Sequence, residues 1–294
     1  MKSYDDILLF LNAANISNKR ILLLIKEKKL DLLLDIHIKK ISVLNFFTNK
    51  EKERLLFLSK DFNLEQYKAS LSKLSIKYIT IFNSDYPEKL TQIYNPPAIL
   101  FYKGNLSYLK DALAVVGSRQ MTNYGLKACH DIIYQLKDAN LGIVSGMALG
   151  IDRQAHIAAI KNGLKTIGVL ASSIDIMYPK SNHDLYHAMD KQLLVSEFGL
   201  NTYPLKHHFV SRNRIIAGIS DAVLLIEAKQ RSGSLITANY ALEQDKTIFA
   251  LPGSIYSEHS QGCHEMIKKG AKLVSSGEDI LEELTYIREV NKLI

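Results

Sequence analysis

The sequence predicts an α/β protein in which a doubly wound, mainly parallel sheet follows a small all-helical N-terminal domain. Two observations lead to this prediction. In residues 1–75 apolar side chains recur at helical spacing and there is almost no glycine. In residues 76–294 short apolar runs alternate with amphipathic stretches of roughly 10–15 residues, which is the rhythm of strand–helix–strand units. We therefore expect one domain in each of these two segments.

The individual elements follow in chain order. In the first segment, Ile7, Leu8 and Leu11 lie at helical spacing, as do Ile21, Leu24 and Ile25. In the second segment, short apolar or alternating runs predict strands at 76–82, 98–102, 114–116, 142–144, 167–170, 193–195, 222–226, 247–251 and 272–274. Amphipathic stretches predict helices at 124–137, 153–161, 212–218, 235–243 and 279–284.

Composition excludes several classes of protein. Of the 294 residues 47% are hydrophobic and 23% are charged, which is typical of a globular chain. No apolar run approaches the roughly 18 residues of a membrane span, and the first residues are acidic rather than those of a secretion signal. Two isolated cysteines, Cys129 and Cys263, cannot form a disulfide framework or a zinc site. We expect a cytoplasmic protein without membrane segment, metal or cofactor.

The positive charge is unevenly distributed. The net charge is +7, and residues 1–75 hold 14 Lys and Arg against 9 Asp and Glu, so most of the excess is N-terminal. The helical segment could use this charge to bind DNA, but evenly spread lysines are more typical of a solvated surface. Only a local cluster of cations would indicate a nucleic-acid site.

Glycine-containing turns follow several predicted strands. They are the turns at 117–119, 145–150, 231–234 and 251–254. Since the carboxyl ends of parallel strands meet at one edge of a sheet, these turns are expected to lie together. Backbone amides at such turns and helix starts bind anions, and Arg119 adds a fixed positive charge. The turns match neither the Walker loop nor the full GxGxxG fingerprint.

A basic and aromatic segment, residues 203–214, adds a second kind of contact. It carries Lys206, Phe209, Arg212 and Arg214. Cations beside an exposed ring are what single-stranded nucleic acid requires, because phosphates meet the cations and a base stacks on the ring. If the segment is helical, Arg212 and Arg214 cannot both face a ligand. The alternative for Phe209 is a place in the core.

No catalytic constellation is predicted. Ser118, Ser145 and Ser234 lie on glycine turns but lack the GxSxG nucleophile motif. Asp152 and Glu227 are the carboxylates nearest to strand ends, and Asp152 is expected to cap its helix rather than to act as an acid or base.

At this point the residues resemble a known family, the bacterial DNA-processing protein A family (DprA, also called Smf). The motifs that carry the resemblance over about residues 76–280 are Asp85-Tyr86-Pro87, Pro96-Pro97, Val116 to Arg119, Ser145 to Asp152, Tyr178 to Asn182, Phe209 to Gly218, Ser232 to Ala238 and Leu251 to Ser254. The resemblance implies an extended Rossmann-like domain and no known enzymatic reaction. It also implies a homodimer that binds and protects single-stranded DNA and helps to load the RecA recombinase during natural transformation.

The resemblance also implies a set of binding residues. Side-chain contacts to DNA would come from Arg119, Lys180, Lys206, Phe209, Arg212 and Asn213, and backbone donors from Gly117, Ser118 and Gly146. A C-terminal winged-helix-like domain, which many members carry, is not expected here.

Two alternatives remain. Phosphoribohydrolases with a similar core carry a catalytic glutamate after a glycine loop, and Thr237 stands at that place in this chain. A small-nucleotide sensor would use the same glycine turns but would not explain the basic and aromatic run from Lys206 to Arg214.

Overall fold

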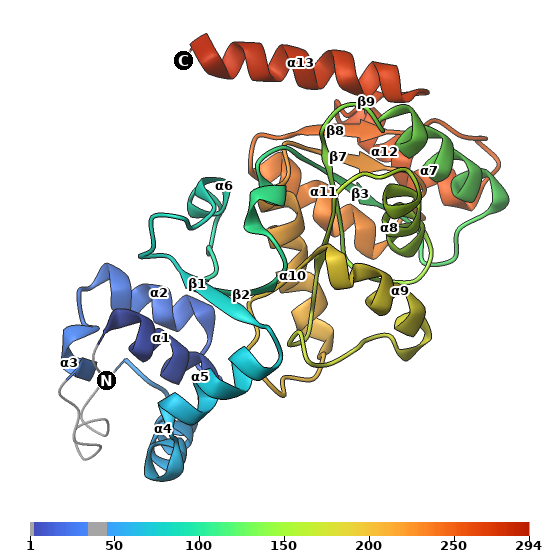
Figure 1. Cartoon of the computed structure of the whole chain (residues 1–294). Helices are drawn as coiled ribbons and strands as arrows, with labels where there is room; N and C mark the ends of the chain where they lie inside the picture. The colour runs from blue at the N-terminus through green and yellow to red at the C-terminus, as the bar shows by residue number, and fades with distance from the viewer. Residues whose placement is uncertain (1–2, 35–45, 294) are drawn as a thin grey trace.

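A mainly parallel sheet forms the centre of the molecule. A computed structural model of the chain describes residues 3–34 and 46–293 (Figure 1). Within them one nine-stranded sheet has the order β1-β2-β6-β5-β4-β3-β7-β8-β9. The strands are β1 (Lys77–Thr80), β2 (Ile99–Lys103), β3 (Ala112–Val116), β4 (Gly142–Ser145), β5 (Thr166–Val169), β6 (Leu193–Ser196), β7 (Ala222–Leu225), β8 (Thr247–Ala250) and β9 (Lys272–Leu273). All pairs from β6 across to β9 are parallel, and the β1–β2 and β2–β6 pairs are antiparallel. The predicted fold class is therefore confirmed.

Helices cover both faces of this sheet. Among the described residues, five helices precede the first strand in the chain: α1 (Tyr4–Ala13), α2 (Asn18–Lys26), α3 (Asp31–Leu34), α4 (Asn49–Asp61) and α5 (Leu64–Lys73). The helices after β1 are α6 (Glu88–Thr91), α7 (Asn123–Gln135), α8 (Ile151–Lys161), α9 (His183–Ala188), α10 (Lys206–Ile219), α11 (Gly233–Glu243), α12 (Gln261–Lys268) and α13 (Gly277–Leu293). Helices α7, α8 and α13 share a buried cluster with one face, and α10, α11 and α12 with the other (Figure 1).

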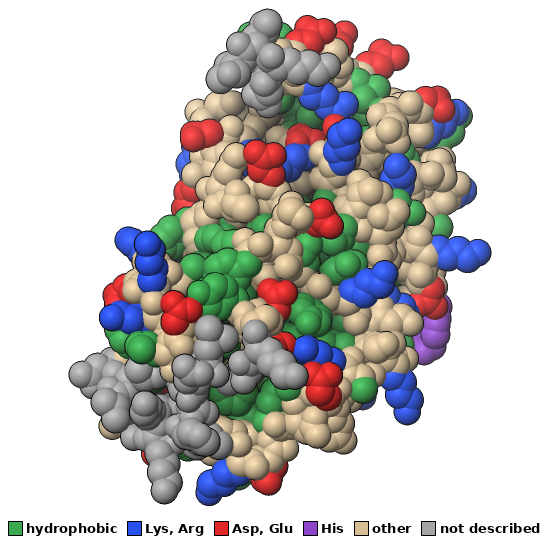
Figure 2. All heavy atoms as spheres, turned by 60° about the vertical axis from the view of Figure 1, so that its left-hand side comes forward, with side chains coloured by type: hydrophobic (Ala, Val, Ile, Leu, Met, Phe, Trp, Pro, Cys, Tyr) green, Lys and Arg blue, Asp and Glu red, His purple; other side chains and the backbone are tan. Residues whose placement is uncertain are grey.

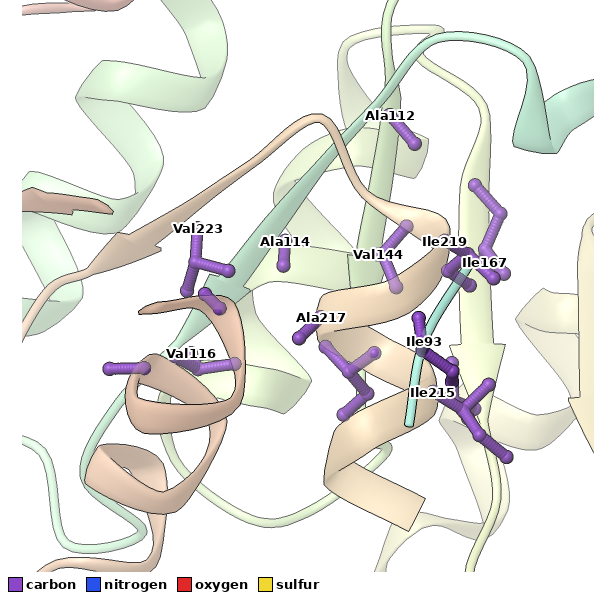
Figure 3. Close-up of a cluster of buried hydrophobic side chains, with 14 of the residues drawn as sticks. Ile93, Ala112, Ala114, Val116, Val144, Ile167, Ile215, Ala217, Ile219 and Val223 are labelled. Atoms are coloured by element: carbon purple, nitrogen blue, oxygen red, sulfur yellow. The ribbon is translucent and has the colours of Figure 1, made fainter. Parts of the chain in front are cut away.

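The alternation of side chains along a strand explains why both faces are covered. In β3, Ala114 and Val116 belong to the core beneath α10, whereas Leu113 and Val115 belong to the core beneath α7 and α8. Figure 3 shows the first of these cores, in which side chains of α10 such as Ile215 lie against the sheet. Strands buried on both faces are apolar throughout, which is why short continuous apolar runs predicted them.

The N-terminal helices have a core of their own and also pack on the sheet. Apolar side chains of α1 and α2, such as Leu11 and Leu24, form one cluster with Leu55 of α4. A different cluster joins Leu9 of α1 to Phe101 of β2. The helices are therefore attached to the β2 side of the sheet, as Figure 1 shows.

The main difference from the predicted elements is the start of α10. The helix begins at Lys206 rather than at residue 212, directly after the extended residue Leu205. The basic and aromatic segment is therefore mostly helical, and its side chains point in directions set by the helix. The predicted helices α7, α8 and α11 differ from prediction mainly at their ends, and α13 is longer than predicted. Helices α6, α9 and α12 are not among the predicted elements. In the described part of the chain no helix is long and apolar enough to cross a membrane.

Candidate nucleic-acid interface

A cavity of about 540 Å³ opens at the carboxyl edge of the sheet. The turns after β3 and β7 form two of its walls and the first half of α10 forms another. Because β3 and β7 are parallel neighbours, their turns open on the same edge. We call this cavity the basic pocket and define it by its lining: residues 116–120, Ala148, Asp152, Phe209, Val210, Arg212, Asn213, Ile216, Lys229, residues 231–234, Ile236 and Thr237.

Six of the nine predicted binding residues line the basic pocket. They are Gly117, Ser118, Arg119, Phe209, Arg212 and Asn213. The other three, Gly146, Lys180 and Lys206, lie outside the lining. The turn after β3 and the helix α10, which are about 90 residues apart in sequence, therefore meet as the sheet topology predicts.

The pocket is strongly cationic. Among the described residues its lining carries Arg119, Arg212, Lys229 and Arg231 but a single carboxylate, that of Asp152. A concave surface with this excess of positive charge focuses the field and favours an anionic ligand.

Phe209 is a half-buried side chain on the pocket wall. The guanidinium carbon of Arg119 lies 5.6 Å from the centre of the Phe209 ring, within the range of a cation–π contact. The ring of Tyr178 packs against it at a centroid distance of 5.6 Å and an angle of 56°. Phe209 thus lines the cavity beside a cation instead of joining the core clusters.

Arg212 does not occupy the position expected of a phosphate contact. It is only 4% exposed, its Nη1 atom donates to the carbonyl oxygens of Gly146 and Val169, and its Nε atom donates to Asn213 Oδ1 at 3.2 Å. Burial lowers the pKa of Arg212 to about 10, so it stays charged at neutral pH. Arg212 therefore lines the pocket as its buried floor, and its predicted contact with DNA stays a prediction. Phe209 lies one turn earlier on the same side of α10. Arg212 is buried because its guanidinium reaches the carbonyls of Gly146 and Val169.

The backbone of Gly146 is likewise already engaged. Its N–H donates to Asp152 Oδ2 at 3.1 Å, so this amide is not a free donor for a ligand. A Cβ atom at this position would overlap the Arg212 guanidinium, which explains the glycine.

Asp152 does not cap its helix as expected: the N-cap of α8 is Gly150, with a φ of +73°. Burial raises the pKa of Asp152, and the nearby Arg212 charge counteracts this.

Lys180 and Lys206 are exposed cations beside the pocket rather than inside it. Lys206 is the first residue of α10, one helical turn before Phe209. Lys180 begins a short 3-10 helix and follows Tyr178 by two residues. That segment is held by the fully buried Asn182, whose Nδ2 atom donates to the Met147 carbonyl at 2.9 Å.

The structure adds pocket residues that the predicted set lacks. The turn after β7 contributes Lys229, Arg231 and Ser232 to Ser234. Its glycine turn is visible in the sequence but cannot be assigned to this cavity without the sheet order. Asn213 joins this turn to α10, because its Nδ2 atom donates to the Gly233 carbonyl at 3.3 Å. Thr237 also lines the pocket, where phosphoribohydrolases would carry a glutamate.

Known proteins resemble this chain over most of its length. The family model described as DNA recombination-mediator protein A matches residues 77–285. The chain belongs to this family. It is 46% identical to the DNA processing protein DprA of Streptococcus pneumoniae over 79% of this chain and 82% of that protein. It is 42% identical to the DNA processing protein DprA of Bacillus subtilis over 74% of each chain.

Two solved structures of family members resemble this one. The crystal structure of DprA from S. pneumoniae has a TM-score of 0.82 and 40% identity, and the match covers 96% of this chain and 99% of that one. A structure of DprA from Helicobacter pylori, reported for its single-stranded DNA binding mode, has a TM-score of 0.64 and 29% identity. That match covers 71% of this chain and 96% of the other.

Proposed function

We propose that this protein binds single-stranded DNA in the basic pocket and acts in DNA recombination. The observation that carries the proposal is the contact of exposed Arg119 with Phe209 on the wall of a cationic cavity. Phosphate contacts supply affinity, and a base stacks on the accessible part of the ring. The H. pylori relative, studied for its single-stranded DNA binding mode, supports the same ligand class.

The chemistry of the pocket favours a single strand over a duplex. Stacking on Phe209 requires an unpaired base, and duplex bases are already stacked on each other. Contacts to phosphates and to the faces of bases carry no sequence code, so binding should be largely independent of sequence.

The finer steps of the function are also part of the proposal. We propose that the protein protects the bound strand and delivers it to the RecA recombinase, in keeping with the recombination-mediator description of the family. We propose a homodimer, because two pockets on one strand would raise avidity without any new contact. The enzyme alternative gains no support from the pocket, because Asp152, its one lining carboxylate among the described residues, already accepts the Gly146 N–H. The nucleotide-sensor alternative would not use Phe209 for stacking along a strand.

The experiment is a binding titration by fluorescence anisotropy. Single- and double-stranded oligonucleotides of equal length are compared over a salt series. We expect tighter binding to the single strand and a steep loss of affinity as salt increases, because bound phosphates release counterions. Tighter binding to the blunt duplex would contradict the proposal. Release of base from nucleoside monophosphates, measured on the same sample, would instead favour the enzyme alternative.

The homodimer is tested separately by light scattering. A mass near twice the 33.2 kDa of the chain is expected at micromolar concentration. A mass of one chain over that range would contradict the dimer while leaving the binding proposal intact.

A further inference from the structure

The turn after β7 carries two cations, Lys229 and Arg231, that have no role in the binding proposed for Arg119 and Phe209. Lys229 and Arg231 line the basic pocket from this turn, whereas Arg119 comes from the turn after β3. Both are exposed. In the described part of the chain Arg231 forms no ion pair or side-chain hydrogen bond, whereas Lys229 donates to Glu258 Oε2 at 2.9 Å.

We propose that Arg231 and Lys229 form a second phosphate subsite in the basic pocket, and that Glu258 weakens this subsite by competing for Lys229. The inference rests on the proposed function and extends it. One strand is then held by two different phosphates, one at Arg119 and one at the turn after β7.

The position of the turn supports a ligand-binding role for Arg231. Asn213 of α10 fixes the backbone of the turn through the Gly233 carbonyl, and Phe209 lies one helical turn earlier on the same helix. The two arginines therefore project from separate turns into one cavity that also holds the stacking ring. The start of α11 adds to the positive potential through its first backbone N–H groups, and no acidic residue in its first turn offsets them.

The charge of the floor adds to this preference for anions. Arg212 is buried and forms no ion pair with a carboxylate in the described residues, since its hydrogen bonds go to two carbonyl oxygens and an amide oxygen. The nearby Asp152 carboxylate offsets part of this charge. Arg119, Lys229 and Arg231 leave the cavity positive overall, which favours an anionic ligand.

The contact between Lys229 and Glu258 is suited to competition with a strand. The side chains are 47% and 72% exposed. Ion pairs as exposed as this one contribute little to stability, so a phosphate can replace the carboxylate at low cost. The Lys229 ammonium holds the pKa of Glu258 below its usual range, so the carboxylate is charged at neutral pH and opposes an incoming phosphate.

The test compares Arg231→Ala, Arg119→Ala and Glu258→Gln with the parent protein in the same single-strand titration. Arg231→Ala should weaken binding about tenfold, the size of one charge-assisted contact. It should also make the slope of log K against log salt shallower by about 0.7, the value for one phosphate of a single strand. Glu258→Gln should strengthen binding about two- to fivefold, since an exposed ion pair is lost and Lys229 becomes free.

Each variant has a matched control. Lys161→Ala removes an exposed cation from the end of α8, a helix that starts at the pocket edge and ends at the opposite edge of the sheet. Glu265→Gln breaks the exposed pair with Lys269, 2.7 Å long, outside the pocket. Both controls should bind like the parent. A gain of affinity in Glu258→Gln cannot come from misfolding, so it tests the subsite even if another variant is unstable.

The outcomes separate the two proposals. If the parent binds no single-stranded DNA, the proposed function itself is wrong. If Arg119→Ala weakens binding but Arg231→Ala and Glu258→Gln both match the parent, the second subsite is wrong and the function stands. If Arg231→Ala weakens binding and Glu258→Gln does not strengthen it, the competition by Glu258 is overturned.

Discussion

Two concave surfaces of this molecule differ in the charge of their lining residues. The basic pocket has four lining cations and, in the described chain, one carboxylate. A cavity of about 300 Å³ between α4 and α5, which we call the N-terminal groove, is lined by aromatic side chains such as Phe57 and Tyr67. Its only charged lining residue among those described is Asp61. Both surfaces present aromatic rings, but only the first can also hold a phosphate.

The comparison also shows that the net charge of a segment does not indicate where its cations gather into a pocket. Residues 1–75 carry most of the positive excess. In their described part, Arg20 lies 3.8 Å from Glu51, and Lys68 lies 2.7 Å from Asp6. On the side of the molecule where the N-terminal helices come forward, Lys and Arg side chains are interspersed with Asp and Glu (Figure 2). The basic pocket lies in the segment that is nearly neutral overall, because folding brings its cations together.

The largest expected effect concerns the pocket floor. Arg212→Met should lower the free energy of unfolding by about 3–5 kcal/mol, because it removes the donors to two buried carbonyl groups and leaves the buried Asp152 without its neighbouring positive charge. Urea denaturation measures this loss. The matched control is Arg119→Ala on the exposed rim, which should change stability by no more than about 0.5 kcal/mol. Equal stability of both variants would show that Arg212 is not part of the folded floor.

The next prediction compares the loss of one phenylalanine ring from each of the two concave surfaces by its effect on DNA affinity. Phe209→Ala should weaken binding of single-stranded DNA by roughly 1–3 kcal/mol through loss of stacking, with the salt slope nearly unchanged. Phe57→Ala removes a ring that is 77% exposed in the N-terminal groove and should leave binding unchanged. Anisotropy titrations and thermal melts are measured on both variants. A Phe209→Ala protein that binds normally but melts at a lower temperature would mean that Phe209 stabilises the fold and does not stack on a base.

Much of the fold could be predicted because it depends on short-range patterns. Residues 112–116 are buried on both faces, so they appear in the sequence as an uninterrupted apolar strand. The edge on which the turns meet also follows from a parallel sheet, so the sequence by itself places Gly117 to Arg119 at that edge. Both features can be predicted without knowing which helix packs on which face of the sheet.

The remaining features depend on long-range packing that the sequence does not display. Arg212 and Phe209 are both in α10, three residues apart, and both line the pocket. Nothing local shows that Arg212 is almost fully buried while Phe209 is half-buried. The burial of Arg212 requires the carbonyls of Gly146, just after β4, and of Val169, at the end of β5, which are both far from α10 in the chain. The sequence places the turns of Arg119 and Arg231 at one edge of the sheet, but only the pairing of β7 with β3 shows that they line the same cavity.

A smaller effect is expected at the ring that supports Phe209. Tyr178→Ala should weaken binding by about 0.5–1.5 kcal/mol, the worth of one aromatic pair, because Phe209 loses the ring that packs against it. Tyr203→Ala is the matched control, since Tyr203 is 68% exposed and lies outside the pocket lining. Equal affinity of the two variants in the anisotropy titration would mean that Phe209 needs no support from Tyr178.

The smallest effect is the one that most directly tests the comparison of charge. Lys26 and Lys28 are exposed cations in the segment with the larger net charge, and neither has an ion pair in the described residues. Replacing both with Ala lowers the net charge from +7 to +5. If charge acts only where it surrounds the pocket, the salt slope should stay that of the parent and affinity should change by less than about 0.5 kcal/mol, because distant exposed charges are screened beyond roughly 8–10 Å.

Direct contact between the N-terminal helices and the strand would give a different salt slope. If the N-terminal helices contact the strand directly, each lost phosphate contact should make the slope of log K against log salt shallower by about 0.7, so the double variant should show a change of about 1.4. Two double variants of equal charge complete the comparison: Arg119→Ala with Arg231→Ala removes two positive charges at the pocket, and Lys26→Ala with Lys28→Ala removes two at the helices. A salt slope that is shallower only in the pocket pair would locate the strand at the sheet edge. Equal slopes in both pairs would mean that the whole positive surface, and not the pocket, attracts the DNA.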